Sequence, residues 1–193
     1  MADSRRTKLL YEQDGPPFPV HVFPEEDVRV DLLPAEAITR HEGGLVEIDF
    51  GAPDEWLEED EPLVGHARDP FHRIDCRRTS RHIVVRIRGS LVADTTRAMA
   101  LFETGLPTRW YIPREDVSAE LTRNDGHRTT CSYKGHATHW DVAGEPAIAW
   151  SYELPLNDAM PVRSMISFYN ERVDIEVDGE PQERPQTPWS RAS

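Results

Sequence analysis

The chain has 193 residues, of which 38% are hydrophobic and 16 are prolines, and its formal net charge is −13. This length suits one domain or two small ones, and so many prolines interrupt long helices, which favours a β-rich fold. The negative charge disfavours nucleic acid as a partner, and the lack of a long apolar run or cleavable leader predicts a cytoplasmic protein without a membrane span.

The opening of the chain resembles a later part of it. Residues 2–32 align with residues 93–121, at an offset of 91 up to Glu12 and of 89 from Pro24 onward. So many matches in the same order indicate an internal repeat.

The first copy is shorter than the second. Phe50 aligns with Phe168 at an offset of 118, so the first copy lacks 118 − 89 = 29 residues, in the part that corresponds to TTCSYKGHATHW (129–140). We therefore expect residues 1–75 to form a truncated, degenerate repeat that packs on a complete β domain at 81–179, followed by a tail at 180–193. Such a chain would be a pseudo-dimer within one polypeptide.

Two features that could suggest a metal site favour other interpretations. The acidic run DEWLEEDE (54–61) lacks the Asp/Asn spacing and turn glycine of a calcium loop, so a solvated surface is expected. Cys76 and Cys131 form no CxxC pair, which favours reduced thiols over a zinc site or a disulfide framework.

The second half of the chain shows the short alternating segments of an antiparallel barrel or sandwich. The runs HIVVRIRG (82–89) and LVAD predict a hairpin, and RVDIEVDG (172–179) predicts a further strand. ATTRAMALFETG is ambiguous and is assigned to a strand, whereas PREDVSAEL, with Pro113 at the first helical position, predicts a short helix. Further strands are expected at RWYI, TTCSY, HATHWDV, AIAWSY and SMISFY.

TTCSYKGHATHW is the segment richest in reactive side chains. If it is one extended strand, Cys131, Tyr133 and His139 share one face, and Lys134 and Trp140 share the other, unless Gly135 introduces a bulge. Its two histidines are three residues apart and point to opposite faces, which disfavours a metal pair.

Lys134 and Cys131 allow two interpretations each. A desolvated Lys134 could bind an anionic group or act as a nucleophile, and Cys131 could react if a cation stabilised its thiolate. Alternatively, Lys134 pairs with Glu103 or Asp116, and Cys131 packs as a small hydrophobe. The tryptophans likewise either line an aromatic pocket or, as favoured here, form the core.

Five motifs in order make the second copy similar to the domain-of-unknown-function family 427, which has no established activity. The resemblance implies a compact antiparallel β domain of barrel or tent type, related to folds that carry zinc; without paired CxxC motifs, no zinc is expected here. The chain departs from the family's Cys-Pro-Tyr-Lys-Gly pattern at Ser132 and has His139 where an aromatic residue is usual. The motifs are GSLVADTTRA (89–98), ETGLPTRWYIPREDV (103–117), TTCSYKGHATHW, AWSYELPL (149–156) and FYNERVDIEVDG (168–179).

These observations lead to three functional hypotheses. The first is a β domain that binds a small polar or anionic molecule in a pocket around Lys134. The second is a protein-interaction scaffold with an exposed apolar patch beside Trp56 and Leu57, and the third is an enzyme with Lys134 or Cys131 as the reactive group. The predicted pocket consists of Arg97, Glu103, Tyr111, Cys131, Tyr133, Lys134 and Trp140.

Overall fold

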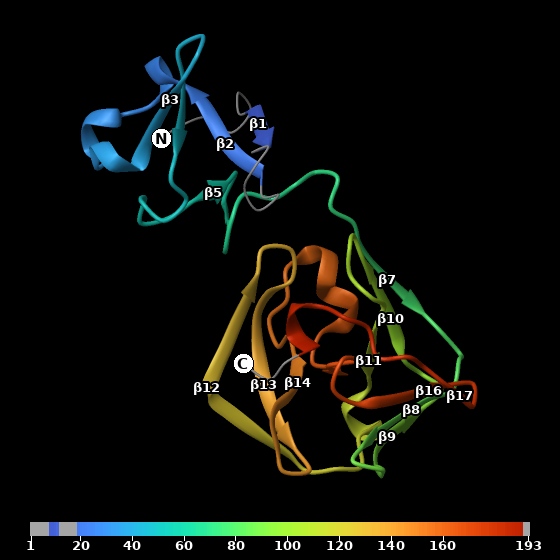
Figure 1. The fold of residues 1–193 in the computed structure, drawn as a ribbon. Helices are drawn as coiled ribbons and strands as arrows, with labels where there is room; N and C mark the ends of the chain where they lie inside the picture. The colour runs from blue at the N-terminus through green and yellow to red at the C-terminus, as the bar shows by residue number, and fades with distance from the viewer. Residues whose placement is uncertain (1–7, 12–18, 191–193) are drawn as a thin grey trace. The chain divides into compact units, whose positions relative to one another are not determined.

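The structure, a computed structural model, describes residues 8–11 and 19–190 (Figure 1). The chain divides into two compact units, Met1–Phe71 and His72–Ser193. Strands dominate both units, and the helical segments that are described are 3-10 turns of three to six residues. None of the described helices has the length and apolar character needed to cross a membrane.

The first unit contains a four-stranded antiparallel sheet in the order β1-β2-β4-β3. Its small core consists of Phe23, Val46 and Ile48, and Trp56 stacks on Phe23 and Phe50. The strands are β1 (Lys8–Tyr11), β2 (Pro19–Pro24), β3 (Ile38–His41) and β4 (Leu45–Ile48), with a separate hairpin of β5 (Leu57–Glu58) and β6 (Glu61–Pro62). The 3-10 turns are η2 (Glu25–Asp27), η3 (Val30–Leu32) and η4 (Ala35–Ala37).

The acidic run at 54–61 forms the β5–β6 hairpin, and its carboxylate side chains are exposed. Leu57 is also exposed, whereas Trp56 is half-buried and donates its indole N–H to the carbonyl of Phe50. The run therefore forms a solvated surface, and Trp56 belongs to the core of the first unit.

The second unit contains two antiparallel sheets. The larger has the order β12-β13-β14-β15-β11-β10-β7, and the smaller has the order β17-β16-β8-β9. The strands are β7 (Ile74–Arg78), β8 (Ile83–Ile87), β9 (Ser90–Thr95), β10 (Met99–Glu103), β11 (Arg109–Ile112), β12 (Leu121–Cys131), β13 (Gly135–Val142), β14 (Glu145–Ser151), β15 (Ile166–Phe168), β16 (Asp174–Val177) and β17 (Glu180–Pro181). The 3-10 turns are η5 (Arg114–Asp116), η6 (Asn157–Val162) and η7 (Pro188–Ser190).

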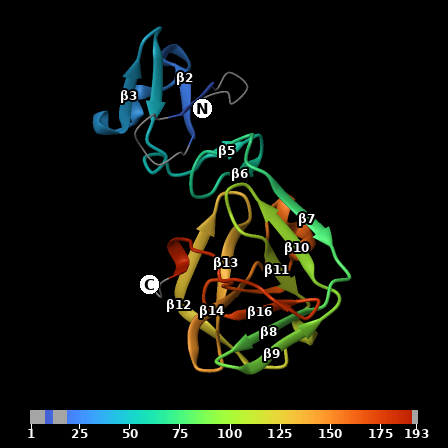
Figure 2. The ribbon, with the colours of Figure 1, turned by 45° about the vertical axis from the view of Figure 1, so that its right-hand side comes forward.

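The larger sheet buries side chains on both faces. One face packs on the smaller sheet, where the predicted apolar residues Ile83, Val85 and Ile87 of β8 are all buried. The other face is concave and curls so that β12 and β13 stand opposite β10 and β7 (Figures 1 and 2). Its apolar cluster comprises Leu101, Tyr111, Ala137, Trp150, Tyr152, Ala159 and Val162.

The mainly β, antiparallel class is confirmed, but the described strands do not close into a barrel. The larger sheet ends at β12 on one side and at β7 on the other, and these two strands are not paired within the described part of the chain. The predicted helix at PREDVSAEL is also wrong in extent. It is the single turn η5, with Pro113 at the N-cap, and β12 begins at Leu121.

TTCSYKGHATHW is not one extended strand. The strands β12 and β13 form a hairpin in which Cys131 pairs with Gly135, so the residues Ser132, Tyr133 and Lys134 make the turn. The predicted alternation of faces therefore breaks at this turn. Within β13 it holds for the two histidines, since His136 is exposed and His139 is buried.

The two units share a sheet order. The order β1-β2-β4-β3 has the same connectivity as β10-β11-β15-β14 in the larger sheet of the second unit, which continues beyond β14 with β13 and β12. The registers also correspond, since Leu10 pairs with Val20 as Leu101 pairs with Arg109.

The strand pairing favours a different partner for Phe168 from the one that the sequence alignment gives. In the first unit Val22 pairs with Glu47, and in the second unit Tyr111 pairs with Ser167. If these two pairs are matched, Ile48 takes the position of Phe168, whereas the sequence alignment places Phe50 there.

Candidate functional site

Lys134 is held at the tip of the β12–β13 hairpin. Its backbone N–H donates to the carbonyl of Cys131 at 3.2 Å, and its carbonyl accepts from the N–H of Leu156 at 3.1 Å. Gly135, with φ +95°, lets the chain leave the turn into β13. The Lys134 side chain is 8% exposed, and its ammonium forms an ion pair with Glu103 at the end of β10.

The Lys134–Glu103 pair continues into an aromatic pair. The second carboxylate oxygen of Glu103 lies 3.1 Å from Nε2 of His72, which precedes β7. The His72 ring stacks on Tyr133 with centroids 3.9 Å apart. Lysine, glutamate, histidine and tyrosine from three parts of the chain thus form one cluster, which we call the Lys134 cluster: His72, Glu103, Tyr133 and Lys134.

Buried phenols and partly buried thiols lie near the Lys134 cluster. Burial raises the pKa of Tyr111 and of Tyr152 well above the ordinary phenol value, so both stay neutral. The indole of Trp150 donates to the Tyr111 hydroxyl at 3.0 Å. Cys131 and Cys76 are free thiols, and the pKa of Cys76 is raised, chiefly by burial.

Five of the seven predicted pocket residues come together in this region of the concave face. They are Glu103, Tyr111, Cys131, Tyr133 and Lys134.

Arg97 and Trp140 lie elsewhere. Arg97 forms an ion pair with Asp116 at 2.6 Å, which fastens η5 beside β9. Trp140 belongs to the core cluster on the opposite face of the sheet, where its indole donates to Ser151 and the Arg114 guanidinium lies 4.4 Å from the centre of its ring.

Sequence reasoning missed His72 and gave Cys76 no part in the pocket. His72 is 31 residues from Glu103, and only the antiparallel pairing of β7 with β10 brings the two together. No local motif marks it.

A second buried ion pair lies on β11. Two guanidinium nitrogens of Arg109 donate to Glu171 at 2.7 and 2.6 Å, and both side chains are almost fully buried. Desolvation opposes ionisation of Glu171, but the hydrogen bonds from Arg109 and Thr187 prevail and lower its pKa. The Arg109 guanidinium also faces Trp150 and Trp189, so it anchors the segment after β17 to the sheet.

Two hollows on the surface of the described part of the second unit are lined by residues other than Lys134. One, of about 260 Å³, lies at a bulge in β12, and the other, of about 360 Å³, lies between Ala119 and Gly144. The Lys134 cluster itself is packed, with the amine engaged by Glu103.

The fold and this cluster define a mainly β domain with a buried polar centre on the concave face of its larger sheet. The model of the family described as domain of unknown function DUF427 matches residues 75–179, which is more than half of the chain. The chain therefore belongs to this family. No curated protein matches it.

Proposed function

We propose that the DUF427 domain of this chain binds a small polar molecule at the Lys134 cluster. The observation that carries the proposal is the burial of an ion pair, since the side chains of Lys134 and Glu103 are 8% and 6% exposed. Removing two charges from water costs several kcal/mol per ion, and apolar residues of the same size are often at least as stabilising. Charged clusters withdrawn from water are therefore candidates for functional sites.

The pairing favours a particular class of ligand. Glu103 compensates the charge of Lys134, so the cluster suits a neutral polar or zwitterionic molecule better than a simple anion. The rings of His72 and Tyr133 stack on each other beside this pair, and the neutral phenols of Tyr111 and Tyr152 can donate hydrogen bonds.

The test combines discovery of the ligand with a matched variant. Small molecules that co-purify with the native protein are identified by mass spectrometry and then added to wild type, Lys134→Met and Arg78→Gln. We expect the ligand to raise the thermal unfolding midpoint of wild type and Arg78→Gln but not that of Lys134→Met. An equal rise in all three proteins would remove Lys134 from the binding site.

A structural role is the second candidate, because the ion pair joins the β12–β13 turn to β10. These strands are far apart in the order of the larger sheet, so the ion pair stabilises the curvature of that sheet. For this role we expect Lys134→Met alone to cost about 3–5 kcal/mol, because it leaves Glu103 buried without a cation, and Lys134→Met/Glu103→Leu to recover much of that loss.

Denaturant unfolding of the two single variants and the double variant measures this coupling. The exposed pair Arg184–Asp174 provides the control, for which Arg184→Ala should cost at most about 1 kcal/mol. A coupling near zero would contradict the structural role. Reactivity of Lys134 or Cys131 stays a hypothesis, which amine- and thiol-directed labelling tests against exposed controls.

A further inference from the structure

The strand β12 carries a bulge of three residues. Asn124 pairs with His139, and the next pair is Arg128 with Thr138, so residues 125–127 have no opposite residues on β13. The bulge is held in place by Asn124, whose amide donates to Asp141 at 2.8 Å and whose oxygen accepts from the N–H of Gly126 at 3.1 Å. The hollow of about 260 Å³ opens at this bulge.

The lining of the hollow is basic, although the chain as a whole carries a charge of −13. Asp125 is its one carboxylate, and it pairs with Arg123 at 2.8 Å. That pair leaves Arg128 without a carboxylate partner among the residues that the structure describes. The lining residues are Arg123, Asn124, Asp125, His127, Arg128, Thr129, His136, Ala137 and Thr138.

A buried histidine beside the hollow has an unsatisfied nitrogen. His139 is 1% exposed, and its Nε2 lies 2.8 Å from the Thr129 hydroxyl, but its Nδ1 has no partner within the described part of the chain. The ring of His127 stands edge-on to His139 at 4.3 Å. A buried polar group without a hydrogen bond costs about 1–3 kcal/mol.

We propose that the hollow at the β12 bulge binds a phosphate-type oxyanion carried by a small molecule. The guanidinium of Arg128 presents paired N–H donors that match two oxygens of a tetrahedral oxyanion. His127, His136 and Thr138 line the same hollow and carry further groups that can donate hydrogen bonds. A hollow of this size holds a phosphoryl group together with part of the molecule that carries it.

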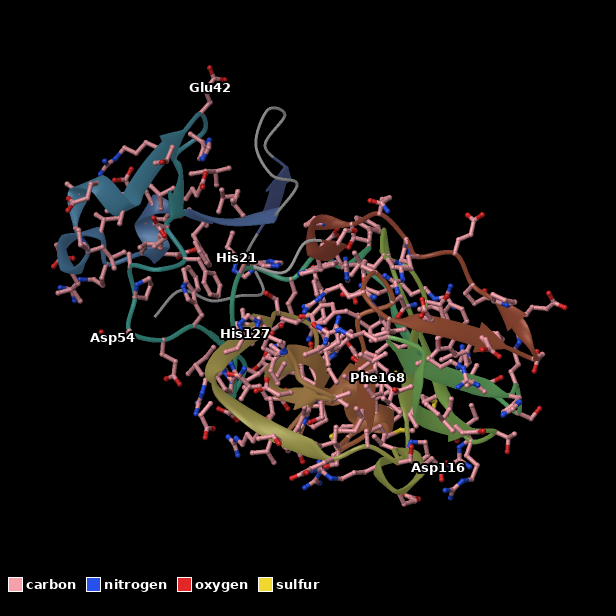
Figure 3. All side chains as sticks on the ribbon, turned by 60° about the horizontal axis from the view of Figure 1, so that its bottom comes forward. His21, Glu42, Asp54, Asp116, His127 and Phe168 are labelled. Atoms are coloured by element: carbon pink, nitrogen blue, oxygen red, sulfur yellow. The ribbon has the colours of Figure 1, made fainter. Side chains whose placement is uncertain are left out.

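This site is separate from the Lys134 cluster and does not depend on the proposed function there. His127 also lies on a different side of the second unit from Asp116, the partner of Arg97 (Figure 3). The predicted anion-binding residues Lys134 and Arg97 each form an ion pair with a carboxylate. Arg128 has no carboxylate partner among the residues that the structure describes.

Calorimetric titration of the full-length chain at low ionic strength tests the proposal. Three compounds are compared: inorganic phosphate, ribose 5-phosphate and ribose. We expect both phosphates to bind and ribose not to bind, with ribose 5-phosphate tighter than inorganic phosphate if the carrier molecule contributes. Equal affinity of the two phosphates would show that free phosphate is the ligand, and no binding of either would overturn the proposal.

Two variants with the same change of charge localise the binding. Arg128→Gln should weaken ribose 5-phosphate about tenfold or more, as expected for loss of a charge-assisted pair. Arg78→Gln, on an exposed part of β7, should bind as wild type does. Because Arg128 is exposed, its variant should keep the wild-type unfolding midpoint. An equal loss in Arg128→Gln and Arg78→Gln would show that binding reflects net charge rather than this hollow.

Discussion

The imidazole of His139 lies almost fully buried beside Thr129, His127 and Tyr169. Burial, and secondarily the neighbouring His127, lowers its pKa from 6.5 to about 4. His139 is therefore neutral in the folded protein near pH 7. The family pattern has an aromatic residue at this position, and a neutral histidine packs as an aromatic ring does.

His139 should make the fold sensitive to mild acid. Between pH 6.5 and 4 the unfolded chain binds a proton at this residue and the folded chain does not, so stability falls as the pH drops through this window. We expect the thermal unfolding midpoint to fall less between pH 7 and 4.5 in His139→Gln than in wild type. His82→Gln, at an exposed histidine, is the control and should follow wild type. Parallel pH profiles for all three proteins would refute the assignment.

At the scale of the element, the β12–β13 hairpin determines which side chains reach the Lys134 cluster. Alternation along one strand would have placed Lys134 and Trp140 on a common face. The turn at residues 132–134 reverses the chain, so Lys134 points to Glu103 while Trp140 packs in the other core. Periodicity predicts faces within a strand, but it does not predict the residue at which a hairpin turns.

Gly135 makes this turn specific. Its φ of +95° disfavours any side chain, and an added Cβ would lie 3.4 Å from the Leu154 carbonyl. We expect Gly135→Ala to cost about 1–3 kcal/mol in denaturant unfolding. Gly144→Ala, at φ +79° with open space around it, should cost less, because only the backbone strain applies there. If both variants lose the same stability, the contact with Leu154 contributes nothing.

At the scale of the molecule, we propose that the first unit is a shortened copy of the second. The sheet orders match. When the strand pairings of the two units are matched, the difference in residue number between equivalent positions is 89 at Val20, 111 at Ile38 and 120 at Glu47. The missing residues therefore fall in two places. About 111 − 89 = 22 correspond to β12 and β13, and 120 − 111 = 9 to the loop that carries η6.

The two units should differ in their ability to fold alone. Both large hydrophobic clusters lie within residues 72–193, whereas the core cluster of the first unit has three buried residues. We expect residues 72–193 to unfold cooperatively in denaturant, with a β-type circular dichroism spectrum, and residues 1–71 to show no cooperative transition. A cooperative transition of residues 1–71 with a comparable midpoint would contradict the idea that the shortened copy lacks a sufficient core.

Much of the architecture follows from local pattern. Alternating apolar residues predicted β8, β9 and β16, because half-buried strands require a period of two. The short helix was overestimated because Pro113 and the acids after it suit both a helix start and a single 3-10 turn. Only the tertiary context separates these two outcomes.

The amino-acid sequence by itself determined the β-rich class and the family, because these depend on composition, local order and motif spacing. Tertiary structure alone decided that Lys134 meets Glu103 and His72, that Arg97 and Trp140 lie elsewhere, and that a bulge opens a basic hollow beside His139. Contacts between residues 31 positions apart depend on how strands pair and curl, and the free energy of that pairing belongs to the whole sheet rather than to any local stretch of chain.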